Sequence, residues 1–475
     1  MQIRNRYKSA IVVAAGMVGL LCGNCLGDRN SDCIKPYAKN PRYWQYRGEP
    51  VLLLGGSKTD HIFLLEDLKD HLDELVGVGG NCVRNTMSQR EELDLKAHKR
   101  LSSGKFDLNQ WNAEYWKRFA NCLKWCQERQ IIIQIEVWDR FDYSQDQWQT
   151  SPWRPGNNIT YTNQQTGLAE KYPDHPWRDK QPFFHAIPGM SRYKKQYDTI
   201  RRFQEAFVGK MLSYSLDYDN VLYCMNNETS TPVAWGRYWM RFIEERAKKK
   251  GVDVYVTDMF DDGHKPQSSA KIRQAFDDPK SYEFMDISQV NSRTFNEAHW
   301  VNIKWLSDQA AKHPRPLNNT KIYSDGKLSF GTGTPIDGVE RFWRNLIAGS
   351  ASCRFHRPGA GIGLNNIAKA CIKAGRKVEK EVRFWNVRPR MDLLKDRQQD
   401  DAYLTAAPGR EYMLYFTDGG SVKLDLKKHK GEFALRWMNI KTGDWAGKNS
   451  ITGGKEVTIA APGKGGWAAT IIKQD

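Results

Sequence analysis

The sequence predicts an α/β protein in which a (β/α)8 barrel, known as a TIM barrel, precedes a small all-β sandwich. Two observations lead to this prediction. Short apolar runs alternate with amphipathic helical stretches through most of the chain, and after about residue 400 the pattern changes to short alternating strands separated by glycine turns. The 475 residues are enough for both domains.

Eight apolar runs are the expected barrel strands, because apolar strands that alternate with helices form parallel sheets. These runs are residues 51–56, 80–87, 131–139, 220–228, 252–260, 284–290, 320–325 and 350–356. The expected helices are residues 64–76, 112–130, 200–216, 238–250, 296–312 and 339–347. An open doubly wound sheet is the alternative, but its glycine-rich phosphate turn is not matched by Gly55, Gly56 and Ser57 after the first run.

A polar, charged segment at residues 388–401 marks the expected domain boundary. We expect a signal peptide at residues 1–27, the barrel at residues 28–395 and the sandwich at residues 396–475. The expected sandwich strands are residues 411–416, 421–426, 433–439, 457–460 and 467–472.

The N-terminus has the features of an export signal. Arg4, Arg6 and Lys8 form a basic start, and residues 10–21 are apolar but too short to span a bilayer. Cys25 and Gly27 then offer small residues at the −3 and −1 sites of a signal peptidase. We therefore expect export to the periplasm, the outer surface or the medium, and no membrane span.

The chain carries a formal net charge of +17, which becomes +14 without the three basic residues of the expected signal. A positive excess favours acidic partners. For an exported protein an anionic polysaccharide suits this charge better than nucleic acid, which we do not expect as a partner. The seventeen tryptophans provide faces on which sugars stack, although most tryptophans fill cores.

The longest expected loop follows the third strand, from Arg140 to about Tyr197, and is rich in aromatic residues such as Trp148, Trp153 and Phe183. Loops of this length are uncommon unless functional. We expect it to form a wall of a binding cleft on the catalytic face. A folded lid with its own aromatic core is the alternative.

Asn227 and Glu228 end the fourth apolar run. A barrel enzyme keeps its reactive groups at the carboxyl ends of its strands, and a carboxyl there can move a proton while the asparagine binds a sugar hydroxyl. Glycoside hydrolysis needs a second carboxyl group from another strand. Asp325, at the end of the seventh run, is the candidate nucleophile opposite Glu228.

Other polar residues near strand ends are expected to bind substrate. They are Arg84, which could hold a carboxylate ionised, and His61, Glu136, Trp138, Asp286 and His356. We predict no cofactor, although Asp258, Asp261 and Asp262 could bind Ca²⁺ through hard oxygen ligands.

Asn227 and Glu228 on the fourth strand, with Arg84 on the second, resemble the clan A glycoside hydrolases, which retain anomeric configuration. Several segments resemble the apiosidase-like barrel hydrolases of bacterial polysaccharide utilisation, and the C-terminal residues resemble the β-sandwich, labelled collagen-binding, that often follows those barrels. The similar segments are residues 40–44, 46–60, 79–84, 341–349 and 401–472.

The sequence departs from the family pattern at the seventh strand. The usual glutamate nucleophile aligns with Lys321, and Asp325 falls on a second acidic position. The resemblance implies a retaining glycoside hydrolase that acts on plant or algal poly- or oligosaccharides, including anionic ones, with Glu228 as acid/base. A non-catalytic glycan-binding protein on a degenerate barrel is the alternative that Lys321 favours. A polysaccharide lyase that acts on uronates is a third hypothesis.

Overall fold

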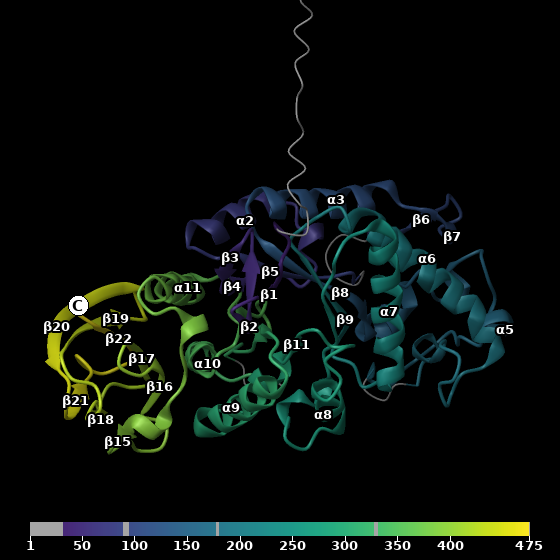
Figure 1. The fold of residues 1–475 in the computed structure, drawn as a ribbon. Coiled ribbons are helices and arrows are strands. Elements are labelled where there is room, and N and C mark those ends of the chain that lie inside the picture. Colours follow the sequence, from purple (N-terminus) through teal and green to yellow (C-terminus); the bar gives the residue numbers. More distant parts are fainter. Residues whose placement is uncertain (1–31, 89–94, 177–179, 327–330, 475) are drawn as a thin grey trace, which may run out of the picture.

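The computed structural model describes residues 32–88, 95–176, 180–326 and 331–474. The expected signal peptide therefore lies outside the described residues. Eight parallel strands form one sheet in the order β10-β9-β8-β5-β4-β13-β12-β11, ringed by helices (Figure 1). The strands are β4 (Leu53–Gly56), β5 (Cys82–Thr86), β8 (Ile132–Asp139), β9 (Val221–Asn227), β10 (Val256–Thr257), β11 (Met285–Asp286), β12 (Leu317–Ile322) and β13 (Ser352–Phe355).

The two ends of this sheet meet, because the backbone N–H of Glu283 before β11 donates to the carbonyl of Val256 in β10 at 3.2 Å. The predicted TIM barrel is confirmed. β10 and β11 are much shorter than expected, with two residues each. The 3₁₀ helices η7 (Asp261–His264) and η8 (Ser288–Asn291) follow them. The seventh strand begins three residues earlier than predicted.

Eight helices of seven residues or more lie among the described residues. They are α2 (Leu68–Gly77), α3 (Ala113–Glu128), α6 (Asp198–Ser215), α7 (Val233–Lys250), α8 (Ala270–Phe276), α9 (Asn296–Lys312), α10 (Pro335–Ala348) and α11 (Asn366–Glu379). The prediction missed α8 and α11. Local signals fix the bounds of α10: Thr334 and Asp337 form a capping box, Pro335 opens the first turn, and Gly349 ends the helix with φ +90°.

A small antiparallel sheet of β1 (Lys35–Tyr37), β2 (Asn40–Tyr46) and β3 (Glu49–Val51) closes the end of the barrel where the strands begin. Trp44 on β2 is fully buried, and its indole N–H donates to Asn318 Oδ1 at 2.9 Å near the start of β12. The ring also packs edge-on against Phe284. The opposite end of the barrel is therefore the one that remains open to a ligand.

The long segment after β8 forms an aromatic core, as in the alternative prediction, and its residues Arg140, Phe141 and His175 also line the cavity at the strand ends, as expected of a cleft wall. Trp148, Trp153 and Phe183 are at most 1% exposed, and the ring of Phe183 stacks on that of Tyr143 at 3.8 Å. Aromatic rings that pack on each other in this way bury a large apolar area, whereas rings that line a solvent-filled cleft would leave much of that area exposed. The short elements of this region are the helices α4 (Gln145–Thr150) and α5 (Asn163–Thr166), packed beside the hairpin β6 (His98–Arg100) and β7 (Phe106–Trp111).

The C-terminal region is a sandwich of a six-stranded and a three-stranded antiparallel sheet, as predicted (Figure 1). The strands are β14 (Arg388–Pro389), β16 (Ala402–Ala407), β17 (Glu411–Phe416), β22 (Trp467–Lys473), β19 (Glu432–Asn439) and β20 (Asp444–Thr452) in one sheet, and β15 (Leu394–Lys395), β18 (Ser421–Asp425) and β21 (Glu456–Ala460) in the other. β14 and β15 precede the expected boundary after residue 395 yet pair with strands beyond it.

The sandwich packs on the barrel through α10. Trp343 of this helix stacks on Tyr415 of β17 with ring centroids 6.0 Å apart, and Arg344 pairs with Asp400 at 2.9 Å. Both α10 side chains are buried. Buried apolar and charged contacts of this kind hold two domains in one orientation. Within the described residues, no helix combines the length and apolarity that a membrane span requires.

Candidate active site

A cavity of about 660 Å³ opens at the carboxyl ends of the barrel strands. Its walls come from residues on or after seven of the eight strands, which is where barrel enzymes place their reactive groups. Charged side chains dominate the lining. The acids are Asp60, Glu228, Asp261 and Asp262, and the Lys and Arg residues are Arg140, Lys271, Arg293, Lys321 and Arg357.

Glu228 lies directly after β9 in the left-handed region, with φ +57°. Strain of this kind at a non-glycine residue is typical of functional positions. Its Oε1 accepts hydrogen bonds from Lys321 Nζ at 2.7 Å and from the Tyr323 hydroxyl at 2.9 Å. In the described part of the chain no group donates a hydrogen bond to Oε2. One carboxylate oxygen is therefore fixed, while the other remains available to a ligand.

Two cations act on the same carboxyl group. Lys321 is fully buried, and Arg140 Nη2 lies 3.9 Å from Glu228 Oε2. Burial alone would raise the pKa of Glu228, but the charges of Lys321 and Arg140 and the hydrogen bonds from Lys321 and Tyr323 lower it far below its usual range. Glu228 is therefore ionised in the ligand-free protein at any ordinary pH.

Arg140 also connects Glu228 to a second acid. Its Nη2 lies 3.1 Å from Asp261 Oδ1, at the start of η7. Since both carboxylates contact one nitrogen, Asp261 Oδ1 and Glu228 Oε2 can be no more than 7.0 Å apart, the sum of the two distances. This pair of carboxylates faces the cavity from neighbouring strands, β9 and β10.

A buried charge network lies beneath Glu228. Arg84 on β5 donates to Glu136 Oε1 at 2.5 Å, to Asn227 Oδ1 at 2.9 Å and to Asp60. Asn227 in turn accepts from Lys321 and donates to Asp139 Oδ2 at 2.8 Å. Asn227 is thus held by three side chains of this network, and it directly precedes Glu228 in the chain.

His356, after β13, lies on the opposite wall. Its Nδ1 lies 3.4 Å from Asp60 Oδ1, and its ring meets the Tyr323 ring edge-on at 4.9 Å. Burial, together with nearby Arg84 and Lys321, lowers the pKa of His356 well below its usual range despite the opposing charge of Asp60. The imidazole is therefore neutral and can exchange hydrogen bonds with a sugar.

Of the residues predicted from the sequence, Glu228, Asn227 and His356 line the cavity together. Arg84 and Glu136 lie below its floor, where they pair with each other. His61 is fully buried, with its Nε2 3.4 Å from Thr59 Oγ1, and it does not line the cavity.

Two further predicted residues do not reach the cavity. Trp138 is 1% exposed among Phe183, Trp235 and Trp239, so it is a core residue and does not shape a sugar subsite. Asp286 lies inside the barrel, where Gln134 Nε2 donates to its Oδ2 at 2.6 Å.

Asp325, the predicted nucleophile, lies in the loop after β12. The hydroxyl of Thr332 donates to its Oδ1. Thr332 lines the cavity, but Asp325 is not among the lining residues.

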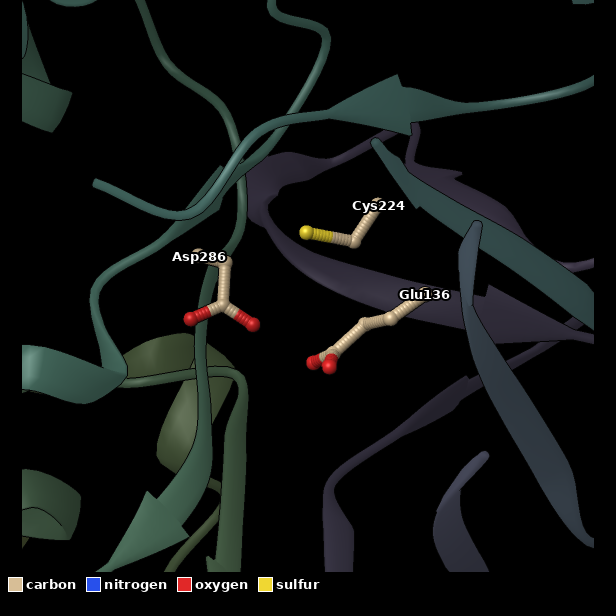
Figure 2. Close-up of side chains that lie close together, drawn as sticks. All are labelled: Glu136, Cys224 and Asp286. Carbon is tan, nitrogen blue, oxygen red and sulfur yellow. The ribbon is translucent and has the colours of Figure 1, made fainter. Parts of the chain in front are cut away.

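Glu136, Cys224 and Asp286 form the one group of acid and thiol side chains with metal-ligand spacing among the described residues (Figure 2). Each of these three side chains has a feature that opposes metal binding. Arg84 binds Glu136, Gln134 binds Asp286, and burial raises the pKa of Cys224 far above its usual range. A metal ion would have to displace these partners, so the donor set does not fit a resident metal. Asp258, one of the possible Ca²⁺ ligands, is instead buried and accepts from Asn226 Nδ2 at 2.9 Å.

Sequence reasoning missed Arg140, Tyr323 and Gln289 as members of the site. Gln289 Nε2 donates to the Tyr323 hydroxyl at 2.8 Å, which directs the tyrosine proton toward Glu228. One signal for Tyr323 was present: it follows Lys321 by two residues, so both side chains point to the same face of the seventh strand.

Residues 93–261 match a family model described as Domain of unknown function (DUF6298). Curated proteins give no match. A glycoside hydrolase family 5 protein from Bacteroides vulgatus ATCC 8482 has 14% sequence identity and a TM-score of 0.62, with 93% of this chain and 94% of that chain covered. A second structure, named Glycoside hydrolase, has 13% identity and a TM-score of 0.62, with coverages of 94% and 98%. The chain therefore has the fold of these glycoside hydrolases, a TIM barrel with a β domain.

Proposed function

We propose that the protein is an exported glycoside hydrolase that cleaves O-glycosidic bonds in plant or algal poly- or oligosaccharides, with Glu228 as the group that moves the proton. The proposal rests on the hydrogen bonding of the two oxygens of the Glu228 carboxylate. Lys321 and Tyr323 hold its Oε1, whereas Oε2 accepts no hydrogen bond from the described residues and lies at the cavity. Oε2 can accept a proton from a bound water or hydroxyl group.

Asp261 is the second carboxylate of this proposal. Glycosidases place two carboxyl groups about 5–5.5 Å apart when they retain configuration and about 6.5–9.5 Å apart when they invert it. The upper limit of 7.0 Å between Glu228 and Asp261 agrees with either arrangement. Asp325, outside the cavity lining, would require a different cavity shape to take this role.

An inverting reaction suits the charges of the site better than the retaining reaction that the family resemblance implies. The strand-seven position of the nucleophile holds Lys321, whose ammonium group cannot form a glycosyl ester. In an inverting reaction Glu228 takes a proton from water while the water oxygen bonds to the anomeric carbon. Asp261 must first leave its ion pair with Arg140 and take up a proton, which it then gives to the departing glycosidic oxygen as the glycosidic bond breaks. The ionised state of Glu228 is the one that a base requires.

A non-catalytic glycan-binding protein is the second candidate. The ion pair between Lys321 and Glu228 favours it, because a carboxylate neutralised in this way is a weaker base. The similarity to apiosidase-like hydrolases and the collagen-binding label of the sandwich remain predictions.

The test is a screen of neutral and acidic plant and algal glycans for new reducing ends, with the wild type, Glu228→Gln and the conservative variant Glu228→Asp. We expect the wild type to release product and Glu228→Gln to lose the activity by about 10²–10⁴-fold. Glycan binding without any product from the wild type would establish the binding protein instead. Release of unsaturated products, which absorb in the ultraviolet, would indicate a lyase.

A further inference from the structure

Arg293 differs from three other cations of the cavity. Lys321 pairs with Glu228, Arg140 with Asp261 and Arg357 with Asp60. The side chain of Arg293 lines the cavity and is exposed, and its guanidinium group has no hydrogen bond or ion pair to any residue in the described ranges. Its charge is therefore not neutralised within the site, unlike the charges of those three residues.

The backbone at Arg293 is fixed in an unusual conformation. Its φ of +59° lies in the left-handed region, which is unfavourable for a residue with a side chain. The Arg293 N–H donates to the carbonyl of Gly331 at 2.8 Å. A Cβ atom on Gly331 would lie 2.8 Å from Arg293 Cγ and 3.0 Å from its Cα, so the glycine leaves the room that this arginine occupies. Such strain persists where surrounding structure holds it, and it is concentrated at functional sites.

Arg341 links the backbone next to Arg293 to Tyr323, which directly follows β12. It is fully buried, and its Nε and Nη2 donate to the carbonyl of Thr294, next to Arg293, at 3.1 and 2.7 Å. Its Nη1 donates to the carbonyl of Tyr323 at 2.9 Å, and the hydroxyl of Tyr323 holds Glu228. The backbone of Arg293 is thus held at a fixed position relative to the Glu228 carboxylate.

We propose that Arg293 binds an anionic substituent, a carboxylate or a sulfate group, on the saccharide that fills the cavity. The proposal rests on the function proposed above and names the substrate class. A guanidinium group binds such oxyanions through two parallel N–H···O bonds, which are stronger than hydrogen bonds between neutral groups. Because the backbone beneath Arg293 is already ordered, binding loses less conformational entropy than it would on a mobile loop.

The experiment compares uronate-containing oligosaccharides with their carboxyl-reduced forms and sulfated oligosaccharides with their desulfated forms. Hydrolysis and calorimetric binding are measured for the wild type, Arg293→Gln and Arg293→Lys. We expect Arg293→Gln to raise KM and Kd for one acidic series by about 10- to 100-fold and to leave the matched neutral series unchanged. Arg293→Lys should recover part of the loss. The series that responds identifies the anion as carboxylate or sulfate.

Arg241→Gln is the matched control, since Arg241 is an exposed arginine on α7 outside the cavity lining. Equal losses for the acidic and neutral members of a pair, no loss in either series, or no binding of any acidic oligosaccharide to the wild type would overturn the proposal. If acidic oligosaccharides bind through Arg293 but are never hydrolysed, the proposed hydrolase function fails while this binding site stands.

Discussion

Lys321 Nζ lies 2.7 Å from Glu228 Oε1, so the seventh strand presents an ammonium group to the carboxylate at the end of the fourth. The clan A resemblance leads one to expect a glutamate at position 321. The substitution changes both the charge and the chemistry of the site, because it removes a nucleophile and stabilises the ionised form of Glu228.

The first prediction concerns the pH dependence of hydrolysis. Lys321 and Arg140 lower the pKa of Glu228, so the wild type should show no loss of kcat/KM from this group as the pH falls from 7 to about 5. In Lys321→Met the Glu228 carboxyl group stays buried while one neighbouring charge is gone, so the pKa of Glu228 should rise. The acid limb of the kcat/KM profile should therefore move to higher pH. Lys321→Arg, which keeps the charge, is the control, and identical profiles for the wild type and Lys321→Met would contradict the assignment.

The second prediction separates the two candidates for the other carboxylate. Asp261→Asn should lower kcat by about 10²-fold or more, because it removes the group proposed to protonate the leaving oxygen. Asp325→Asn should change kcat by no more than a few-fold, since Asp325 does not line the cavity. A larger loss of kcat in Asp325→Asn than in Asp261→Asn would assign the role of the second carboxylate to Asp325. A proton NMR spectrum of the first product gives the stereochemistry, and we expect inversion.

The third prediction concerns the buried network below the cavity. Removing one partner of a buried ion pair leaves an uncompensated charge and typically costs about 3–5 kcal/mol. Arg84→Met should therefore lower the urea midpoint strongly, since Glu136 would lose its cation and Asp60 would keep only its ion pair with Arg357. Arg129→Met, which breaks an ion pair to the exposed Asp73, should change it little. Similar midpoints for the two variants would show that the network contributes little to stability.

The fourth prediction concerns stability against pH. Burial raises the pKa of Asp258 to about 7, whereas in the unfolded chain it is about 3.9. The folded protein thus binds this proton more tightly, so its stabilising contribution is complete below about pH 4 and is lost as the pH rises through 7. Asp258→Asn cannot titrate, and its free energy of unfolding should fall less than that of the wild type between pH 4 and 7. Parallel curves would show that Asp258 is ionised in the folded protein.

Much of the fold could be predicted, because the apolar runs and amphipathic stretches report burial directly. The strand that ends in Asn227 and Glu228 was predicted to within a residue at each end. The short strands β10 and β11 were not, because the apolar residues of 252–260 and 284–290 extend beyond the two hydrogen-bonded positions of each strand. The aromatic residues after β8 look alike in sequence whether they bind sugar or pack on each other.

The site was predictable only at the strand ends. Glu228 and His356 carry a positional signal, since each directly follows an apolar strand. Arg140 directly follows β8 and so carries the same signal, which the prediction missed. Arg293 depends on where the loop after β11 folds back over the barrel, which spacing does not reveal. Trp138 illustrates the opposite error: it lies near the end of β8, but its ring packs against Phe207 of α6 and Trp239 of α7 and does not face the cavity.

The most direct measurement of the central claim is the turnover of Glu228→Gln on a glycan that the wild type hydrolyses, with the affinity measured on the same preparation. Glutamine keeps the shape of the side chain but cannot take up a proton. We expect Glu228→Gln to lose kcat by about 10²–10⁴-fold while its Kd changes only a few-fold. A variant that turns over at the wild-type rate would show that Glu228 does not carry the reaction.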